Sequence, residues 1–323
     1  MSGLTLNEIS GGQGAIPGFS ILVERVPGKF DMILSKDNPF YKDLPGLSVL
    51  LGGMWIMNIS YWSFNQYIIQ RALAAKDLKE AQKGIAFAAY LKLLKPVIVV
   101  LPGIAAVVLA PDLARPDQAY PTMMRLFPTG ILGLVFAALI AAIVASTASK
   151  INSIATIFTL DLYNQGETKH EEKRLVLVGR IAATVSIVLA VLTARPLLGN
   201  FDQGFQYIQE FTGFFTPGIV VIFMLGLFWK KASEAGALAA AIGSFVFSGL
   251  VWMYLPSLPY MDRVGIVFLM ALGLAVGVSY LKPAAASANH INTVDADYST
   301  TISYNIASAG AFMIVIALYA AWW

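Results

Sequence analysis

The chain has 323 residues, of which 57% are hydrophobic and 13% are charged, whereas a soluble domain carries about 25% charged residues. So few charges cannot coat a surface that faces water, and lipid must therefore cover much of the chain. The formal net charge of +3 is small and scattered between apolar runs, so we expect no nucleic-acid partner. The absence of cysteine excludes disulfides, thiolate metal sites and cysteine nucleophiles.

Long apolar stretches dominate the sequence. A helix needs roughly 20 mainly apolar residues to cross a hydrocarbon core about 30 Å thick. Eight stretches meet this length and lack the alternation of a membrane β-barrel, namely residues 46–67, 84–109, 129–162, 173–194, 206–228, 234–255, 263–281 and 303–322. The sequence therefore predicts an all-α membrane protein with about eight transmembrane helices.

Basic residues in the connecting loops predict the orientation, because short cytoplasmic loops carry an excess of lysine and arginine. One alternate set of loops holds ten such residues and the opposite set holds four. We therefore expect a plasma (inner) membrane protein with residues 1–45 and the C-terminus outside. Residues 1–45 are polar with four prolines, and we interpret them as an extracellular loop that continues a longer protein.

The first span carries polar residues in its middle. Ionisable and amide side chains at membrane depth are costly, so each is a candidate functional residue. Apolar sequence gives way at Asn58 to serine, tyrosine and asparagine, which favours a broken helix whose free backbone groups bind solute. Tyr61 and Trp62 can stack on the apolar face of a sugar. The alternatives are polar contacts between helices and an interfacial aromatic belt.

Two later spans add polar candidates. Lys92 lies about 12 Å into its span, at about 1.5 Å per residue, which favours a binding site, whereas Lys95 is expected to extend to the cytoplasmic interface. Gln206 and Gln209 share one helix face. These amides either hydrogen-bond solute hydroxyls or cap the external end of the helix.

Small and hydroxyl residues fill the third span around Ala142, Ala145 and Ser146. Oxygen atoms on one face suit a hard cation such as sodium, but small residues equally permit close helix packing. Lys150 would repel a cation unless it points towards the cytoplasm. The residues alone leave both interpretations open.

No catalytic pattern competes with transport. The sequence lacks a nucleophile elbow, and Gly52-Gly53 lacks the lysine and hydroxyl residue of a phosphate-binding loop. We therefore expect neither an enzyme nor a cofactor.

Several blocks resemble the solute:sodium symporter family, in particular its bacterial sodium/sugar members. They occur in order over essentially the whole chain and include Tyr61-Trp62-x-Phe64-Asn65-Gln66-Tyr67, Tyr90-Leu-Lys92, Leu101-Pro-Gly103, Ala119-Tyr-Pro121-Thr122, Asn152-Ser-x-Ala-Thr-x-Phe158, Phe205-Gln-Tyr-Ile-Gln-Glu210 and Gly226-Leu-Phe-Trp-Lys-Lys231.

The resemblance implies a leucine-transporter-type fold of two inverted five-helix repeats. Residues 46–228 would form the second repeat and residues 229–323 three accessory helices, while the first, N-terminal repeat of the same protein would be missing. It also implies binding residues for a galactose- or glucose-like sugar. Asn58, Lys92 and Gln209 would hydrogen-bond the sugar, and Tyr61 would be the inner gate that stacks on it.

The same resemblance implies a sodium site. Its ligands would be the backbone of Ala142 and the side chains at positions 145 and 146. Ala145 stands where sugar symporters carry serine, which removes one hydroxyl ligand unless Thr147 or water replaces it.

The implied function is sodium-coupled sugar symport by alternating access, with Na⁺ as the coupling ion. Four alternatives remain open. The solute is another small molecule, such as an amino acid, a vitamin, urea or iodide. The driving ion is a proton or is absent. The domain is a symporter-like sensor. The chain is a truncated fragment without transport activity.

Overall fold

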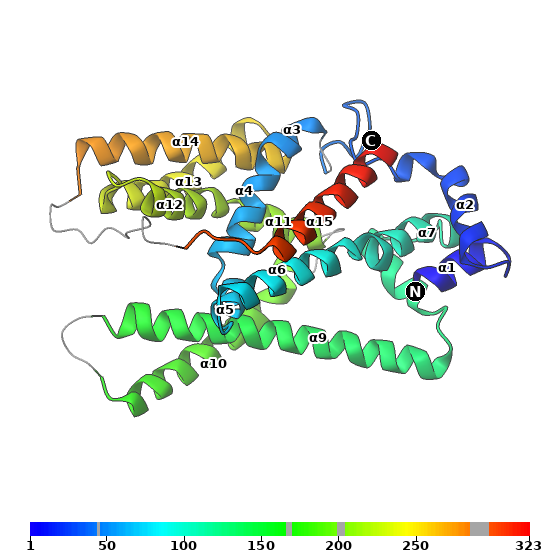
Figure 1. Ribbon diagram of the computed structural model, residues 1–323, viewed down its shortest axis with the longest axis horizontal. Coiled ribbons are helices and arrows are strands. Elements are labelled where there is room, and N and C mark those ends of the chain that lie inside the picture. The colour runs from blue at the N-terminus through cyan, green and yellow to red at the C-terminus, as the bar shows by residue number, and fades with distance from the viewer. Residues whose placement is uncertain (44–45, 166–169, 199–203, 285–296) are drawn as a thin grey trace. The chain divides into compact units, whose positions relative to one another are not determined.

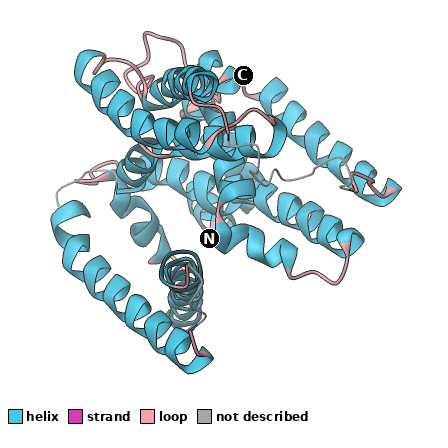
Figure 2. Cartoon of the chain, turned by 90° about the vertical axis from the view of Figure 1, so that its left-hand side faces the viewer, coloured by secondary structure: helices cyan, strands magenta, loops and turns pink. Residues whose placement is uncertain are grey.

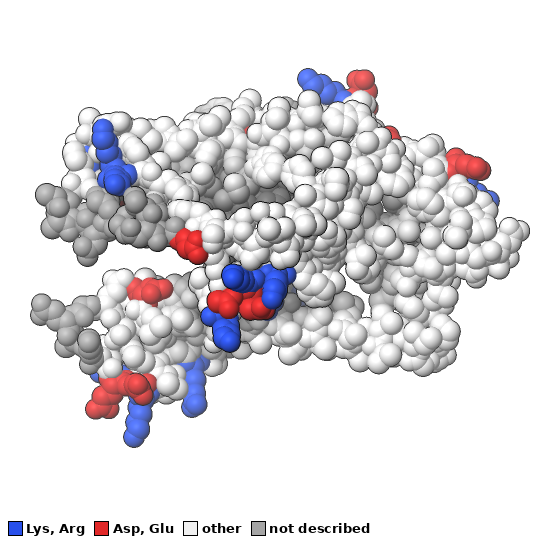
Figure 3. Space-filling model, in the orientation of Figure 1, with Lys and Arg blue, Asp and Glu red and all other residues white. Residues whose placement is uncertain are grey.

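The computed structural model describes residues 1–43, 46–165, 170–198, 204–284 and 297–323, and all regular secondary structure in these residues is helical (Figure 2). Six of the described helices are long and apolar enough to cross a membrane, and one bent pair raises that number to seven. In the view of Figure 3, charged side chains gather in a few patches and leave broad uncharged surfaces. The prediction of an all-α, multi-pass membrane protein is confirmed.

The chain divides into two compact units, each described by itself. The first unit comprises Met1–Arg25 and Leu94–Gly204, and the second comprises Val26–Leu93 and Phe205–Trp323. The first unit contains α1 (Ser2–Ile9), α2 (Ala15–Arg25), a π-helix (Pro96–Val100), α7 (Leu101–Leu109), α8 (Ala119–Met124), α9 (Thr129–Thr156), a π-helix (Ile157–Tyr163) and α10 (Glu172–Leu198).

Two helix pairs organise the first unit. The helices α9 and α10 pack against each other (Figure 1) and expose most of their described residues, as lipid-facing or partner-facing helices do. The helices α1 and α2 cross closely, because a Cβ atom at Gly18 would lie 1.8 Å from the Leu6 carbonyl oxygen. The polar segment 1–45 therefore contains two helices and a 3₁₀ turn, while its external position stays a prediction.

The core of the second unit is a set of helices that pack against one another partly through small residues. Its helices are α3 (Leu47–Leu51), α4 (Gly53–Ile59), a π-helix (Ser60–Phe64), α5 (Gln66–Leu73), α6 (Leu78–Leu93), α11 (Gly204–Gly213), α12 (Thr216–Phe228), α13 (Glu234–Tyr254), α14 (Tyr260–Leu281) and α15 (Ile302–Ala321). The helices α12, α13 and α14 lie side by side (Figure 1), and their core contains Val221, Ala240, Ala271 and Ala275.

Polar contacts fix the last helix of this unit to α6. The buried amide of Gln82 donates to the Ser299 carbonyl (2.7 Å) and accepts from the Thr301 N–H (3.1 Å). The Tyr90 hydroxyl donates to the Ala307 carbonyl (2.9 Å). The Gln82 amide thus takes the place of water as a partner for backbone groups just before α15, while Tyr90 contacts the helix further along.

The predicted span 46–67 is not one helix, which is why the described structure offers six or seven spans and not eight. It is interrupted at Gly52, whose backbone is non-helical, and again beyond the π-helix, where Asn65 is extended. The predicted span is therefore broken, but at Gly52 and Asn65 and not at its middle, because Asn58 lies within α4. The other seven predicted spans each correspond to a long helix or to the bent pair.

We predict that Gly53→Ala destabilises the protein. The helix α4 approaches α14 so closely at Gly53 that a Cβ atom would lie 1.9 Å from the Met261 carbonyl oxygen. Backbone atoms cannot move aside as a side chain can, so we expect the free energy of unfolding to fall by about 1–3 kcal/mol. The measurement is the thermal unfolding midpoint in detergent, which should be lower in the variant. The control is Gly249→Ala, where the added methyl group meets no atom within 4 Å. Equal midpoints for both variants would contradict the packing described.

Candidate functional site

The break after α4 presents an aromatic cluster. Tyr61 and Trp62 lie in the π-helix and are exposed, and their rings meet edge to face with centroids 5.3 Å apart. Past the extended Asn65 the chain turns into α5, where the Tyr67 hydroxyl donates to that of Tyr61 (3.0 Å). The broken helix therefore brings two tyrosine hydroxyls and three ring faces together, which an unbroken helix over these residues would spread around its circumference.

Lys92 completes this group from α6. Its ammonium nitrogen lies 4.5 Å from the centroid of the Trp62 ring, a cation–π geometry that partly compensates the loss of water around a charge. We call Tyr61, Trp62, Tyr67 and Lys92 the aromatic–lysine cluster. It combines flat apolar faces with a cationic donor and two hydroxyl groups. These are groups that can bind a neutral polyhydroxylated molecule.

Asn58 and Gln209 occupy other positions in the same unit. Asn58 is exposed on α4, and its amide nitrogen donates to the Met54 carbonyl one turn back (2.8 Å). Gln209 is half-buried on α11. The structure thus brings two of the four predicted solute-binding residues, Tyr61 and Lys92, into one cluster through Trp62, whereas Asn58 and Gln209 lie outside the contacts that hold that cluster.

The predicted sodium ligands all belong to the first unit. Ala142, Ala145 and Ser146 lie on α9 and are exposed. The helix is regular here, so each backbone carbonyl keeps its helical hydrogen bond and has one lone pair left. The Ala145 carbonyl also accepts from the Ser149 hydroxyl (2.9 Å). On this face, Ser146 carries an exposed hydroxyl oxygen and Ala142 an exposed backbone carbonyl group.

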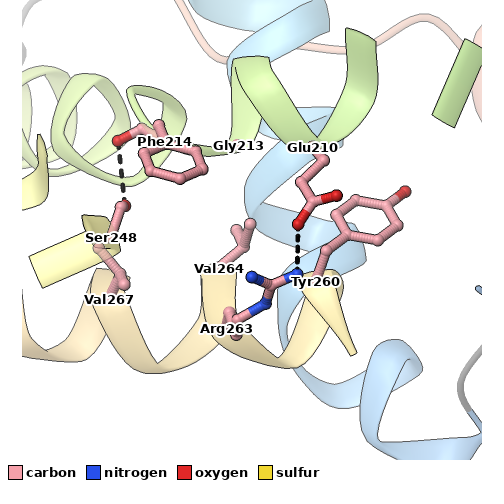
Figure 4. Close-up of a pocket in the computed structure, with 8 residues that line it drawn as sticks. All are labelled: Glu210, Gly213, Phe214, Ser248, Tyr260, Arg263, Val264 and Val267. Atoms are coloured by element: carbon pink, nitrogen blue, oxygen red, sulfur yellow. Dashed lines mark hydrogen bonds and ion pairs between the residues drawn. The ribbon is translucent and has the colours of Figure 1, made fainter. Parts of the chain in front are cut away.

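Sequence reasoning missed an ion pair between α11 and α14. Arg263, the first residue of the predicted span 263–281, lies in the first turn of α14 and donates to the carboxylate of Glu210 (Figure 4). Both residues line a hollow of about 20 Å³, which has room for one water molecule and no sugar. The sequence offered one signal for this pair, because Glu210 and Arg263 carry opposite charges and each stands at the start of an apolar stretch.

Comparison with known proteins assigns the family. The profile of the sodium:solute symporter family matches residues 13–243. The chain belongs to this family. It is 43% identical to a sodium/glucose cotransporter of Vibrio parahaemolyticus over 99% of this chain and 62% of that protein. It is 39% identical to sodium/myo-inositol cotransporter 2 of Oryctolagus cuniculus, over 62% of this chain and 32% of the relative.

A third relative is a sodium/mannose cotransporter of Bos taurus, 36% identical over 66% of this chain and 38% of that protein. This family member therefore spans about three fifths of the length of its Vibrio relative and about a third of the length of the two mammalian ones.

We predict that Lys92→Ala weakens solute binding by this protein. The change removes the cationic donor of the aromatic–lysine cluster, and the loss of one charge-assisted hydrogen bond corresponds to about tenfold or more in Kd. Isothermal calorimetry on the purified protein measures the effect. Lys95→Ala, which removes an exposed lysine from the same helical run, serves as the control. Unchanged affinity in Lys92→Ala would remove Lys92 from the site.

Proposed function

We propose that this chain is part of a sodium-coupled symporter that moves a sugar-like solute across the membrane by alternating access. The observation that carries the proposal is the aromatic–lysine cluster at a broken helix in a chain of the sodium:solute symporter family. Broken helices near the bilayer midplane form the solute sites of many secondary transporters. The solute crosses unchanged, so no enzymatic step and no cofactor other than the coupling Na⁺ are involved.

The chemistry of the cluster supports a polyhydroxylated ring as solute. Aromatic faces pack against the apolar face of such a ring, while tyrosine hydroxyls and an ammonium group hydrogen-bond its hydroxyls. The printed names of the relatives mention glucose, myo-inositol and mannose, which share this character. We propose that Tyr61 stacks on the solute as the inner gate, and that Lys92, Asn58 and Gln209 hydrogen-bond to it.

The coupling ion would bind at α9. We propose that the Ala142 carbonyl and the Ser146 hydroxyl are two of its ligands, and that position 145 contributes no side-chain oxygen. Further ligands would come from an N-terminal repeat outside this chain, with residues 46–228 as the second inverted repeat of a leucine-transporter-type fold and residues 229–323 as accessory helices. In this proposal residues 1–45 and the C-terminus face the outside.

Sodium and solute are coupled when both favour the same conformation. Each ligand then raises the affinity for the other by the same factor, because the coupling free energy is reciprocal. A ligand that bound both conformations equally would shift nothing. The proposal therefore requires that solute affinity rise with sodium concentration.

We predict that Tyr61→Ala impairs sodium-dependent uptake, whereas Tyr61→Phe keeps most of it. The alanine variant loses the ring that closes over the solute, while the phenylalanine variant loses only the hydroxyl that receives the hydrogen bond from Tyr67. The measurement is uptake of radiolabelled glucose, galactose and myo-inositol into proteoliposomes, with the protein in the length that the cell makes. Choline replaces sodium in the control. Normal uptake by Tyr61→Ala would refute the gate role.

We predict opposite effects at two neighbouring positions of α9. Ser146→Ala removes a proposed sodium ligand and raises the half-saturating sodium concentration about tenfold, whereas Ala145→Ser adds a hydroxyl oxygen and lowers it. Uptake measured against sodium concentration checks both variants. Solute uptake that ignores sodium in all three proteins would contradict sodium coupling, and unchanged sodium dependence in both variants would move the ion site away from α9.

A further inference from the structure

The helix α11 is held differently from the helix that follows it. The two form a bent pair with an angle of 47°. The helix α12 is embedded, with Thr216, Pro217, Val220 and Val221 buried against its neighbours. Of the described residues of α11, only the last, Gly213, is buried, and in the described part of the chain α11 packs extensively against no other helix. The helix α11 is therefore a short, loosely packed helix joined at the bend to α12, which its neighbours hold in place.

The point of the bend is anchored to α13. The Phe214 carbonyl, which the break frees from helical bonding, accepts hydrogen bonds from the hydroxyls of Ser244 (3.2 Å) and Ser248 (3.1 Å). The Gly218 N–H donates to the Ser244 hydroxyl (3.0 Å). Two serines thereby replace the helical partners that the kink removes. They fix the position of the bend, and the Thr216 hydroxyl links the two half-helices across it by donating to the Thr212 carbonyl (2.9 Å).

The Glu210–Arg263 ion pair adds a restraint away from the bend, because it ties α11 to α14. Glu210 lies one turn before the bend, directly after Gln209, and its carboxylate receives the Arg263 guanidinium (Figure 4). The Arg263 side chain is 10% exposed and that of Glu210 is 33% exposed. A second polar contact lies one turn earlier, where the Gln206 amide donates to Asp43 (2.6 Å). The ion pair is the more buried of the two contacts, so solvent weakens it less.

We propose that Arg263 is a positioning residue for solute binding. It holds Glu210 and so fixes the angle of α11 about the bend, which places the neighbouring Gln209 relative to the rest of the second unit. The role of Gln209 rests on the proposed function, whereas the restraint on α11 does not. Without the ion pair, α11 samples a wider range of angles and Gln209 meets the solute in only some of them.

The decisive variant neutralises both partners. Replacing only one would leave a buried charge unpaired and could unfold the protein, whereas replacing both leaves no lone charge and is often close to neutral for stability. We therefore use Glu210→Gln with Arg263→Met, and Arg263→Lys as the conservative variant that keeps the charge. The matched control is Glu80→Gln, which breaks the exposed ion pair with Lys83 on α6.

A distance measurement tests the restraint without any transport assay. Because the chain has no cysteine, Ile208→Cys on α11 and Leu238→Cys on α13, both exposed, give two unique spin-label sites. Double electron–electron resonance on the labelled, purified protein should show a clearly broader distance distribution in the doubly neutralised variant. Arg263→Lys and Glu80→Gln should keep the narrow distribution. An unchanged distribution in the doubly neutralised variant would overturn the proposal.

Solute kinetics test the consequence for Gln209. A positioning role predicts that the doubly neutralised variant raises the solute KM about tenfold and keeps its thermal unfolding midpoint, and that Arg263→Lys restores most of the affinity. A broader distance distribution with an unchanged KM would overturn the link to Gln209 and leave the restraint on α11 standing. Absence of uptake in the unaltered protein would count against the proposed function, while the spin-label result would still decide the role of Arg263.

Discussion

Lipid offers no hydrogen bonds, so every interruption of a membrane helix must find partners for the backbone groups that it frees, or expose them to water. Besides Gly52, the second unit of this chain is interrupted at two further places. At Phe214 the freed carbonyl receives two serine hydroxyls from α13, and the break is sealed within protein. At residues 60–65 the chain passes through a π-helix to an extended Asn65, and aromatic and basic side chains gather around it. The first break is structural, and the second has the composition of a binding site.

The contrast between fixed and free elements follows from this constraint. The helices α12, α13 and α14 pack through alanine, glycine and serine, so their backbones approach closely and resist movement. The helix α11 and the cluster around Tyr61 project from that rigid frame and depend on individual polar or ring contacts. A transporter needs this combination, because a site must keep its geometry while the elements that cover it change position.

The helices were predictable because apolar length is a strong signal. Polar residues within the apolar run correctly indicated that the first span is interrupted, but the interruptions lie at Gly52 and Asn65 and not at Asn58. The contact between Lys92 and Trp62 joins residues 30 positions apart in the sequence, and periodicity within one helix gives no information on it. Gly52 also looked like part of a continuous span, because its non-helical backbone leaves no trace in hydropathy. The ion pair between Arg263 and Glu210 was missed for a related reason, because hydropathy gives no information on contacts between helices. The individual roles of Asn58, Gln209, Ala142, Ala145 and Ser146 remain predictions.

The central claim is that the break at residues 60–65 opens onto water within the membrane. Ser63→Cys, in the exposed part of the π-helix, and Leu269→Cys, on an exposed face of α14, each introduce one thiol into a cysteine-free chain. The measurement is the rate of reaction of each thiol with a charged, membrane-impermeant thiol reagent in proteoliposomes. The account predicts that Ser63→Cys reacts and is protected by bound solute, while Leu269→Cys stays unreactive in lipid. Two equally unreactive thiols would contradict it.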